Sequence, residues 1–221
     1  MIYLISGLGA DERVFQSLDL SEYDKKFIRW LDPKKGESLT SYCHRLTLQI
    51  APDQEVILVG VSFGGIIAQE IAKLVSCKLV IIISSIKSIN EFSWTLKLAR
   101  ATQIHRVIPS AILLWANKLT ADYYFGVRSE HESRLLQQII DDTNPKFLRW
   151  AIHQIMNWKQ QYYLENLVHI HGSADRIFPI KKILNAIEIP NGGHFMIVSE
   201  ASKIEQLIFA ELNRNQDGPR K

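Results

Sequence analysis

Short apolar runs bounded by turn residues recur along this chain, and they constrain its fold more than any other feature. Their apolar residues are mostly continuous rather than alternating, which is typical of strands buried on both faces of a parallel sheet. Helical patterns separate the runs, and such alternation predicts an α/β fold with a doubly wound sheet. The expected strands are Ile2–Ser6, Lys26–Trp30, Val56–Val61, Leu79–Ser84, Leu167–His171 and Ala186–Ile189, and the expected helices are Glu12–Leu18, Leu39–Ile50, Ile66–Leu74 and Ile197–Leu212.

The region from residue 86 to residue 158 breaks this alternation. It holds no convincing strand, but it shows helical periodicity in "SWTLKLARATQI", "SRLLQQIIDD" and "PKFLRWAIHQIMNW". The strand–helix order resumes at Leu167, so an all-helical insertion in an α/β core is the simplest explanation. We therefore expect a core formed by residues 1–85 and 159–221, with residues 86–158 inserted as a helical cap.

Size and composition exclude several classes of protein. The chain has 221 residues, of which 47% are hydrophobic and 22% charged, as in a globular enzyme rather than a disordered protein. A net charge of +3 from scattered basic residues argues against nucleic-acid binding. No apolar run approaches the ~20 residues of a membrane span, and the opening residues lack signal-peptide features. We expect no membrane association, a cytoplasmic location and free thiols at Cys43 and Cys77.

A first glycine motif, Gly7-Leu8-Gly9, follows the opening strand, and Asp32 follows the second strand, as in a dinucleotide-binding site. The position of the third glycine is occupied by Glu12. Its carboxylate would repel a pyrophosphate at the helix N-terminus, and its side chain would obstruct the packing of helix on strand. We therefore predict no bound nucleotide cofactor.

A second glycine motif, "VGVSFGG", places Ser62 where a strand becomes a helix. A serine on such a sharp turn has a strained backbone, so its neighbours must be small, and Gly60, Gly64 and Gly65 meet that requirement. The turn also aims the backbone N–H of Phe63 toward the place where a negative oxygen would develop. Taken alone, the motif also fits a tight strand–helix turn with a capping serine.

A serine hydroxyl needs a base to become a nucleophile, and the base needs an acid to orient it. Asp175 follows the fifth expected strand, and His194 follows the sixth. Together with Ser62 they are expected at the carboxyl edge of the sheet, where open α/β sheets form their sites. Taken singly, Asp175 also fits an Asx turn before Pro179, and His194 also fits a helix cap.

His169 and His171 alternate on one expected strand, so their side chains point to the same face of the sheet. A metal site that they share with Asp175 is conceivable at this spacing. Packed or hydrogen-bonded histidines are the favoured interpretation, and we predict no metal.

Four segments are similar to motifs of the α/β-hydrolase superfamily, namely "SGLGADERVF", "GVSFGG", "HGSADRIFP" and "GGHFM". The resemblance covers essentially the whole chain and implies an α/β-hydrolase fold, with a six-stranded, mostly parallel sheet and helices on both faces. It implies Ser62 as nucleophile, Asp175 as acid and His194 as base. It also implies that the backbone N–H groups of Leu8 and Phe63 form the oxyanion hole.

The sequence departs from that family at two points. Many members have His-Gly where this chain has Ser6-Gly7. The chain also opens at the position of the family's third strand, without the usual antiparallel pair before it. We therefore expect a minimal version of the fold.

The resemblance implies cleavage of a carboxylic ester or thioester through an acyl-enzyme, without metal or organic cofactor. The same residues also serve amide, lactone, carbon–carbon or hydroxynitrile cleavage, and a small-molecule binding protein on this scaffold is a further alternative. Aromatic residues of the insertion, among them Trp94, Trp115 and Trp150, favour an aromatic-lined pocket for a small substrate with an apolar acyl or alcohol group. The oligomeric state stays open.

Overall fold

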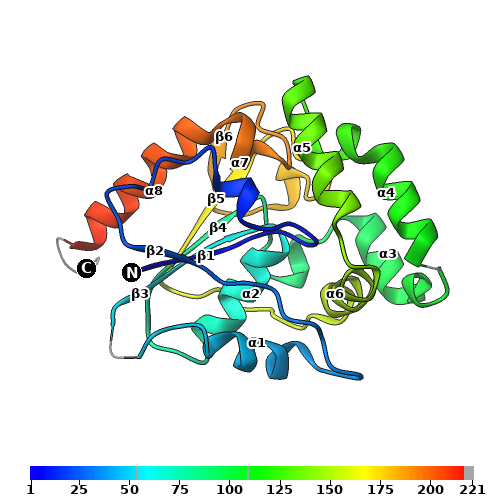
Figure 1. Cartoon of the computed structure of the whole chain (residues 1–221), viewed down its shortest axis with the longest axis horizontal. Coiled ribbons are helices and arrows are strands. Elements are labelled where there is room, and N and C mark those ends of the chain that lie inside the picture. The colour runs from blue at the N-terminus through cyan, green and yellow to red at the C-terminus, as the bar shows by residue number, and fades with distance from the viewer. Residues whose placement is uncertain (53, 109, 217–221) are drawn as a thin grey trace.

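The computed structural model describes residues 1–52, 54–108 and 110–216, apart from the side chains of residues 110–117 and 215–216. Its centre is a six-stranded sheet in the order β2-β1-β3-β4-β5-β6, and every pairing is parallel (Figure 1). This is the expected α/β fold. The strands are β1 (Ile2–Ile5), β2 (Lys25–Phe27), β3 (Val56–Val61), β4 (Cys77–Ile83), β5 (Leu167–Gly172) and β6 (Ile187–Ile189).

Alternate residues of each strand pack against opposite layers of helices, which explains the continuous apolar runs. Leu4 and Ile81 face a core completed by the 3₁₀ helix η1 (Glu12–Phe15) and by α8 (Ala201–Gln216). Ile5 and Ile82 face the other core, which is completed by α1 (Leu39–Thr47) and α2 (Phe63–Ala72). Figure 1 shows α1 and α2 on one side of the sheet and α8 on the other.

Several element bounds differ from the sequence expectations. The expected helix Glu12–Leu18 is only the short η1, and the strand expected at Lys26–Trp30 is the three-residue edge strand β2. Helix α2 begins at Phe63 rather than Ile66. Its first turn contains two glycines, which normally disfavour a helix but are needed here because the helix packs closely on the strands. The expected terminal helix is divided into α7 (Met196–Ser199) and α8, with Glu200 between them at φ −121°.

The segment between β4 and β5 contains helices and no strand among its described residues. Serine and asparagine N-caps start three of these helices, with Ser93 before α3, Ser129 before α5 and Asn144 before α6. Figure 1 shows the four α-helices gathered at one end of the sheet. They are α3 (Trp94–Thr102), α4 (Ser110–Phe125), α5 (Glu130–Asp141) and α6 (Pro145–Asn157), with η2 (Ile89–Glu91) and η3 (Ile104–Arg106) alongside.

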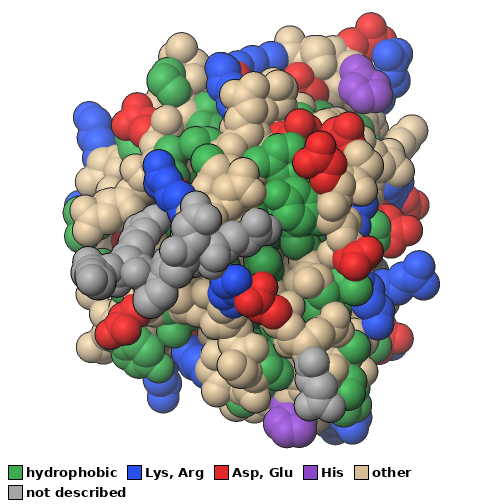
Figure 2. Space-filling model, turned by 90° about the vertical axis from the view of Figure 1, so that its left-hand side faces the viewer, with side chains coloured by type: hydrophobic (Ala, Val, Ile, Leu, Met, Phe, Trp, Pro, Cys, Tyr) green, Lys and Arg blue, Asp and Glu red, His purple; other side chains and the backbone are tan. Residues whose placement is uncertain are grey.

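Two observations bear on the expectations about membranes and nucleic acid. Among the described residues, no helix is both long and apolar enough to cross a membrane. Figure 2 shows one face of the molecule, on which Lys and Arg side chains are interspersed among Asp and Glu. This face therefore lacks the one-signed field that electrostatic recognition of nucleic acid requires.

Stability should depend strongly on the central strand β4. Ile82 is fully buried there, so the substitution Ile82→Ala is expected to lower the free energy of unfolding by about 2–5 kcal/mol through lost burial and a residual cavity. Ile104→Ala is the matched control, because Ile104 is 50% exposed, and its change should stay below about 1 kcal/mol. Urea denaturation of both variants measures the difference, and equal losses would contradict the assignment of the core.

Candidate active site

Ser62 lies between β3 and α2 in a backbone conformation that L-residues rarely adopt, with φ 54° and ψ −119°. The glycines around it allow this turn. A Cβ on Gly60 would lie 2.3 Å from the Gly64 carbonyl oxygen, and one on Gly64 would lie 2.2 Å from the carbonyl oxygen of Ser6. A Cβ on Gly65 would meet the side chain of Ser85 at 2.5 Å. The start of helix α2 therefore packs on β3 and on the residues that follow β1 and β4 at distances that leave no room for a Cβ.

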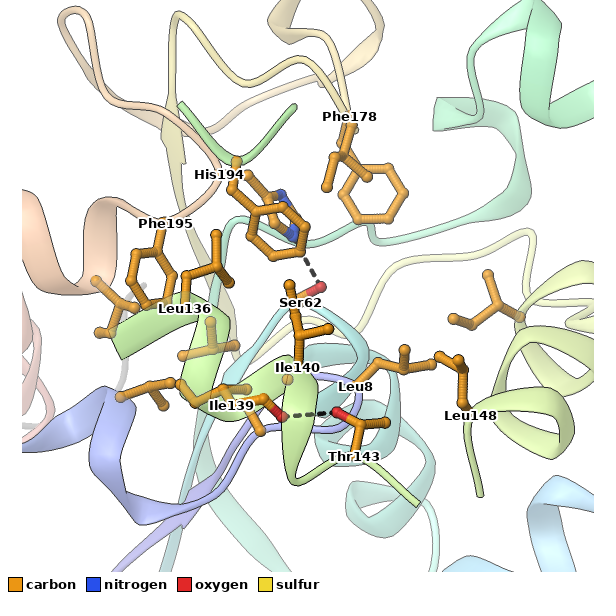
Figure 3. A pocket seen from close by; sticks show the side chains of 18 of the residues that line it. Leu8, Ser62, Leu136, Ile139, Ile140, Thr143, Leu148, Phe178, His194 and Phe195 are labelled. Carbon is orange, nitrogen blue, oxygen red and sulfur yellow. Dashed lines mark hydrogen bonds between the residues drawn. The ribbon is translucent and has the colours of Figure 1, made fainter. Parts of the chain in front are cut away.

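The three side chains singled out in the sequence are in hydrogen-bond contact. His194 Nε2 lies 2.9 Å from Ser62 Oγ (Figure 3). On the other side of the ring, His194 Nδ1 lies 2.8 Å from Asp175 Oδ2. A carboxylate only accepts, so Nδ1 carries the proton and Nε2 is the acceptor that faces the serine hydroxyl. His194 and Asp175 are 3% and 4% exposed. In this tautomer the imidazole is able to take a proton from the serine.

The loop after β5 holds the carboxylate of Asp175 through several donors. Its Oδ1 accepts hydrogen bonds from the backbone N–H groups of Ile177 and Phe178, each at 2.8 Å. Burial by itself would raise the pKa of Asp175, but the His194 and His171 rings and the Phe178 N–H together hold that pKa below its ordinary value. Asp175 is therefore ionised at neutral pH and supports a positive charge on His194.

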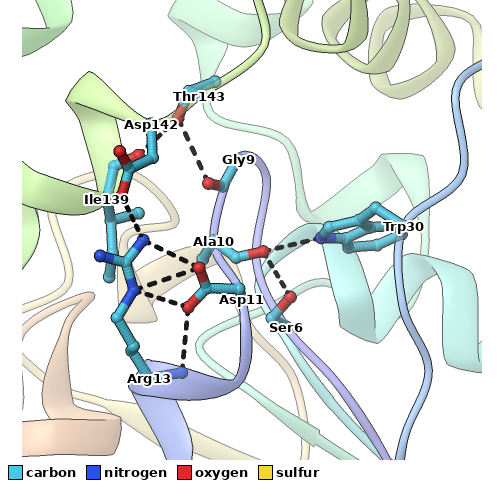
Figure 4. A network of polar contacts seen from close by, with 9 residues as sticks. All are labelled: Ser6, Gly9, Ala10, Asp11, Arg13, Trp30, Ile139, Asp142 and Thr143. Atoms are coloured by element: carbon cyan, nitrogen blue, oxygen red, sulfur yellow. Dashed lines mark hydrogen bonds and ion pairs between the residues drawn. The ribbon is translucent and has the colours of Figure 1, made fainter.

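The loop after β1 carries Leu8, one of the two residues whose backbone N–H groups were expected to form an oxyanion hole. Leu8 and Ser62 both line the same cavity, and Phe63 is the first residue of α2. The Ala10 carbonyl oxygen accepts from Ser6 Oγ at 2.7 Å and from Trp30 Nε1 at 2.8 Å, which fixes this loop (Figure 4). Ser6, which stands where many family members have histidine, thus ties the loop to itself.

The same loop is joined to the end of α5. Thr143 Oγ1 lies 2.8 Å from the Ile139 carbonyl oxygen of α5, to which it donates, and 3.2 Å from the Gly9 carbonyl oxygen (Figure 4). The guanidinium of Arg13 bridges Asp11 and Asp142, with a contact of 2.8 Å to each. These contacts connect the loop that carries Leu8 to the helical segment between β4 and β5.

An apolar cavity of about 330 Å³ opens onto Ser62 and His194 (Figure 3). Among the described residues that line it, Ser62, Thr143 and His194 have polar side chains and none is charged. The lining is mostly aliphatic, whereas aromatic residues of the insertion were expected. Its aliphatic members include Leu96, Leu136, Ile139, Ile140, Leu148, Ile152, Ile155 and Met156 from the helical segment.

The insertion's aromatic residues mostly lie elsewhere. Trp94 is 73% exposed, and Trp150 packs against Tyr42 with ring centroids 4.3 Å apart. Among the described residues of the segment between β4 and β5, Phe125 is the aromatic residue that lines the cavity, beside Phe178 and Phe195 from later in the chain. The side chain of Trp115 lies outside the described residues. The apolar spacing of "SRLLQQIIDD" is the sequence signal that points to Leu136, Ile139 and Ile140, because i, i+3 and i+4 share one helix face.

The other candidate sites find no support in the described residues. The groups of His, Cys, Asp and Glu among them include no cluster that could hold a metal ion. Asp32 lies 3.5 Å from the Asn144 side-chain amide, so it faces the helical segment. Cys43 and Cys77 are free thiols, as expected, and burial raises the pKa of Cys77 to about 11.

A six-stranded parallel sheet with a strained serine at a strand–helix turn defines the class of fold. The chain belongs to the alpha/beta hydrolase family, whose sequence model matches residues 6–206.

Similar solved structures cover nearly the whole chain. A bromoperoxidase from Bacillus anthracis is 20% identical with a TM-score of 0.69, over 96% of this chain and 91% of its own. A thermophilic esterase from Thermogutta terrifontis is 15% identical with a TM-score of 0.68, over 97% and 89%. MenH from S. aureus is 15% identical with a TM-score of 0.72, over 97% and 94%. These likenesses show the fold alone, and no curated protein sequence matches the chain.

The close packing at the turn is testable by stability. Gly64→Ala would force a methyl group into the carbonyl oxygens of Ile5 and Ser6, and we expect a loss of about 3 kcal/mol in the free energy of unfolding. Gly7→Ala is the control, because a Cβ there meets Ser62 Cβ at an ordinary 3.5 Å. Thermal and urea unfolding of both variants measure the effect, and a fully stable Gly64→Ala protein would contradict the packing argument.

Proposed function

We propose that this protein is a serine hydrolase that cleaves carboxylic esters or thioesters with an uncharged, aliphatic acyl group. The observation that carries the proposal is the continuous hydrogen-bonded series of Ser62, His194 and Asp175 at the wall of an apolar cavity. Membership of the alpha/beta hydrolase family supports hydrolysis as the reaction class. The esterases among the solved structures of similar fold are consistent with ester substrates.

In the first half of the proposed reaction, Ser62 Oγ attacks the carbonyl carbon of the substrate while His194 Nε2 accepts the hydroxyl proton. Asp175 holds the imidazole and stabilises the imidazolium that forms. The N–H groups of Leu8 and Phe63 donate to the oxyanion of the tetrahedral intermediate. The imidazolium then gives its proton to the leaving alcohol or thiol, and the acyl group remains bonded to Ser62.

In the second half, water takes the place of the leaving group. His194 accepts a proton from the water as it attacks the acyl carbonyl, and the same two N–H groups bind the new oxyanion. Collapse of this intermediate breaks the bond to Ser62, whose oxygen regains the proton from His194. The carboxylic acid leaves, and every step uses groups of the chain itself.

We assign residues 86–158 as a cap over residues 1–85 and 159–221, which form the core. Helices α5 and α6 from this segment supply much of the cavity lining. The contacts of Thr143 with Gly9 and of Asp142 with Arg13 hold the segment against the loop that carries Leu8. The cap thus shields the acyl group from water, which strengthens the electrostatic stabilisation of the oxyanion.

The lining of the cavity supports a particular class of substrate. An aliphatic lining without charged side chains disfavours sugars, phosphates and charged acyl groups, since their polar atoms would lose water without gaining partners. Its volume of about 330 Å³ lies near the lower end of the range for small-molecule sites. We therefore propose a short to medium alkyl chain as the acyl group.

The nucleophile is tested by Ser62→Ala. We expect kcat for a short-chain p-nitrophenyl ester to fall by about 10⁴-fold or more, because the variant has no hydroxyl to form the acyl-enzyme. Wild-type protein should be labelled by a fluorophosphonate probe at Ser62, as located by peptide mass spectrometry, and the variant should not be. Ser41→Ala, at an exposed position of α1, is the control and should keep full activity and labelling.

Either of two results would contradict the assignment. If Ser62→Ala retained wild-type activity, the nucleophile would be another residue. If folded wild-type protein neither reacted with the probe nor hydrolysed any ester of a substrate panel, a binding protein on the hydrolase scaffold would be the better conclusion.

The acyl preference is tested with a series of p-nitrophenyl esters. We expect kcat/KM to rise about fourfold for each added methylene from acetate until the cavity is filled, because each buried CH₂ contributes roughly 0.8 kcal/mol. A hemisuccinate ester of similar length should be much poorer, because its carboxylate would be buried without a partner.

A cavity-filling variant locates the acyl group. Ile152→Phe narrows the cavity and should shift the optimum to a shorter chain, while activity on acetate changes little. Ile104→Phe carries the same substitution on an exposed side chain of η3 and should leave the preference unchanged. An unchanged optimum in Ile152→Phe would place the acyl group outside this cavity.

A further inference from the structure

A line of buried polar side chains leads away from Asp175 into the protein. His171 is fully buried, and the exposed fractions of His169, Lys87 and Glu91 are 2%, 4% and 1%. They do not belong to the described lining of the cavity, so contact with substrate does not account for them. Buried imidazole, ammonium and carboxylate groups lose hydration, so each requires a partner.

The hydrogen bonds of His171 with the Asp175 loop determine which of its ring nitrogens carries the proton. Its Nε2 lies 2.7 Å from the Phe178 carbonyl oxygen and 3.6 Å from Asp175 Oδ2. Both oxygens only accept, so Nε2 carries the proton. In the neutral ring Nδ1 is then an acceptor, and it faces His169 Nε2 at 3.1 Å.

The contacts of Lys87, at the far end of the series, determine which ring nitrogen of His169 carries the proton. Lys87 Nζ lies 3.1 Å from His169 Nδ1 and 3.3 Å from Glu91 Oε1, and it also donates to the Leu184 carbonyl oxygen. An ammonium group only donates, so His169 Nδ1 accepts and Nε2 carries the proton. This is the proton that His171 Nδ1 needs, so the assignments made from the two ends agree.

The surroundings keep both rings neutral. Burial lowers the pKa of His169 well below its ordinary value, and the nearby His171 and Lys87 lower it further, against the opposing effect of a hydrogen bond to the Ser85 backbone. Burial also lowers the pKa of His171, against the opposing effects of Asp175 and of the hydrogen bond to Phe178, while His194 adds to the lowering. Burial lowers the pKa of Lys87, and Glu91 opposes it and favours the ammonium form.

We propose that Lys87, His169 and His171 form a positioning relay that holds the acid of the active site in place. His171 holds the Phe178 peptide by its carbonyl oxygen, and the N–H of that residue holds Asp175 Oδ1. This proposal rests on the proposed function, because it assigns Asp175 as the acid that orients His194.

Lys87 gives the relay its direction. With the ammonium present, each donor along the series points toward the Asp175 loop, from Lys87 to His169 to His171 to Phe178. Without it, His169 Nδ1 loses the donor that faces it, and only the Phe178 carbonyl oxygen and Asp175 Oδ2 favour the present tautomers. The other tautomer of His171 would turn a lone pair toward the Phe178 carbonyl and the Asp175 carboxylate, which would repel it.

The relay is tested first in the wild-type protein, by ¹⁵N–¹H correlation spectra of the histidine side chains. We expect Nε2 to be protonated and Nδ1 unprotonated in both His169 and His171 at neutral pH. A protonated Nδ1 in either ring would overturn the proposal. This measurement needs no substrate, so it gives an answer even if ester hydrolysis proves to be the wrong reaction.

The second test is Lys87→Met, which removes the donor and keeps the length of the side chain. We expect kcat for an ester substrate to fall about tenfold through displacement of Asp175, with KM within about twofold because the cavity is untouched. The acid limb of kcat/KM should move to lower pH, because a displaced Asp175 stabilises the His194 imidazolium less. Loss of the ammonium charge alone would move that limb to higher pH, since a nearby positive charge opposes protonation.

Lys73→Met is the matched control. Lys73 also pairs with a glutamate, Glu70, and also lies over a tyrosine ring, at 5.7 Å from its centroid against 5.5 Å for Lys87. The Lys73→Met substitution should leave the pH profile of kcat/KM and the histidine tautomers unchanged. His171→Gln, whose amide is able to donate to the Phe178 carbonyl oxygen, should retain more activity than His171→Leu. Equal activity in these two variants, or an unmoved acid limb in folded Lys87→Met, would overturn the relay.

Discussion

The left-handed backbone of Ser62 is the constraint on which the rest of the site depends. A non-glycine residue in a sparsely populated region costs on the order of 1–3 kcal/mol and persists only where its surroundings determine it completely. The Ser62 N–H donates to the Ile83 carbonyl oxygen at 2.9 Å, and its own carbonyl oxygen accepts from Gly65 N–H and Ser85 Oγ. The peptides on both sides are thus fixed, and the hydroxyl is oriented toward His194 before any substrate binds.

The apolar surroundings of Ser62, His194 and Asp175 strengthen the hydrogen bonds between them. The same surroundings require that the buried charge of Asp175 has partners. An isolated carboxylate at the position of Asp175 would be protonated rather than buried with its charge. Two backbone N–H groups and the His194 ring keep it ionised. The described residues that line the cavity beside the serine add no charged side chain, so the nearest fixed charges and dipoles at Ser62 are those of His194, Asp175 and the N-terminal end of α2.

Sequence reasoning identified the fold and the chain positions of Ser62, Asp175 and His194, because these depend on local patterns. Continuous apolar runs determine parallel strands, and parallel strands bring the residues after them to one edge of the sheet. The limits of η1 and β2 were misjudged because edge elements have weak apolar patterns. The first turn of α2 was not predicted because it contains two glycines, and glycine is a poor helix former except where close packing requires it.

The cavity and the relay were beyond such reasoning for a different reason. Lys87 and His169 are 82 residues apart in the chain, and only the pairing of β4 with β5 brings them together. "HIH" on a strand shows that two imidazoles share a face, but it does not show whether a metal, an ammonium group or apolar side chains lie opposite. That choice is made by tertiary packing, which also decides which insertion residues face the cavity.

A buried lysine–glutamate pair is weak evidence for stability, because apolar residues of the same volume often stabilise a core as well or better. What distinguishes the pair of Lys87 and Glu91 is the direction in which the Lys87 ammonium group donates its hydrogen bonds. Glu91 also accepts from the backbone N–H groups of Lys87 and Leu184, so the ammonium group is held in one place and faces one histidine nitrogen. A charge fixed in this way favours the same histidine tautomers as the Phe178 carbonyl oxygen and Asp175 do from the other end, in the relay that we propose between the interior of the sheet and the loop that carries Asp175.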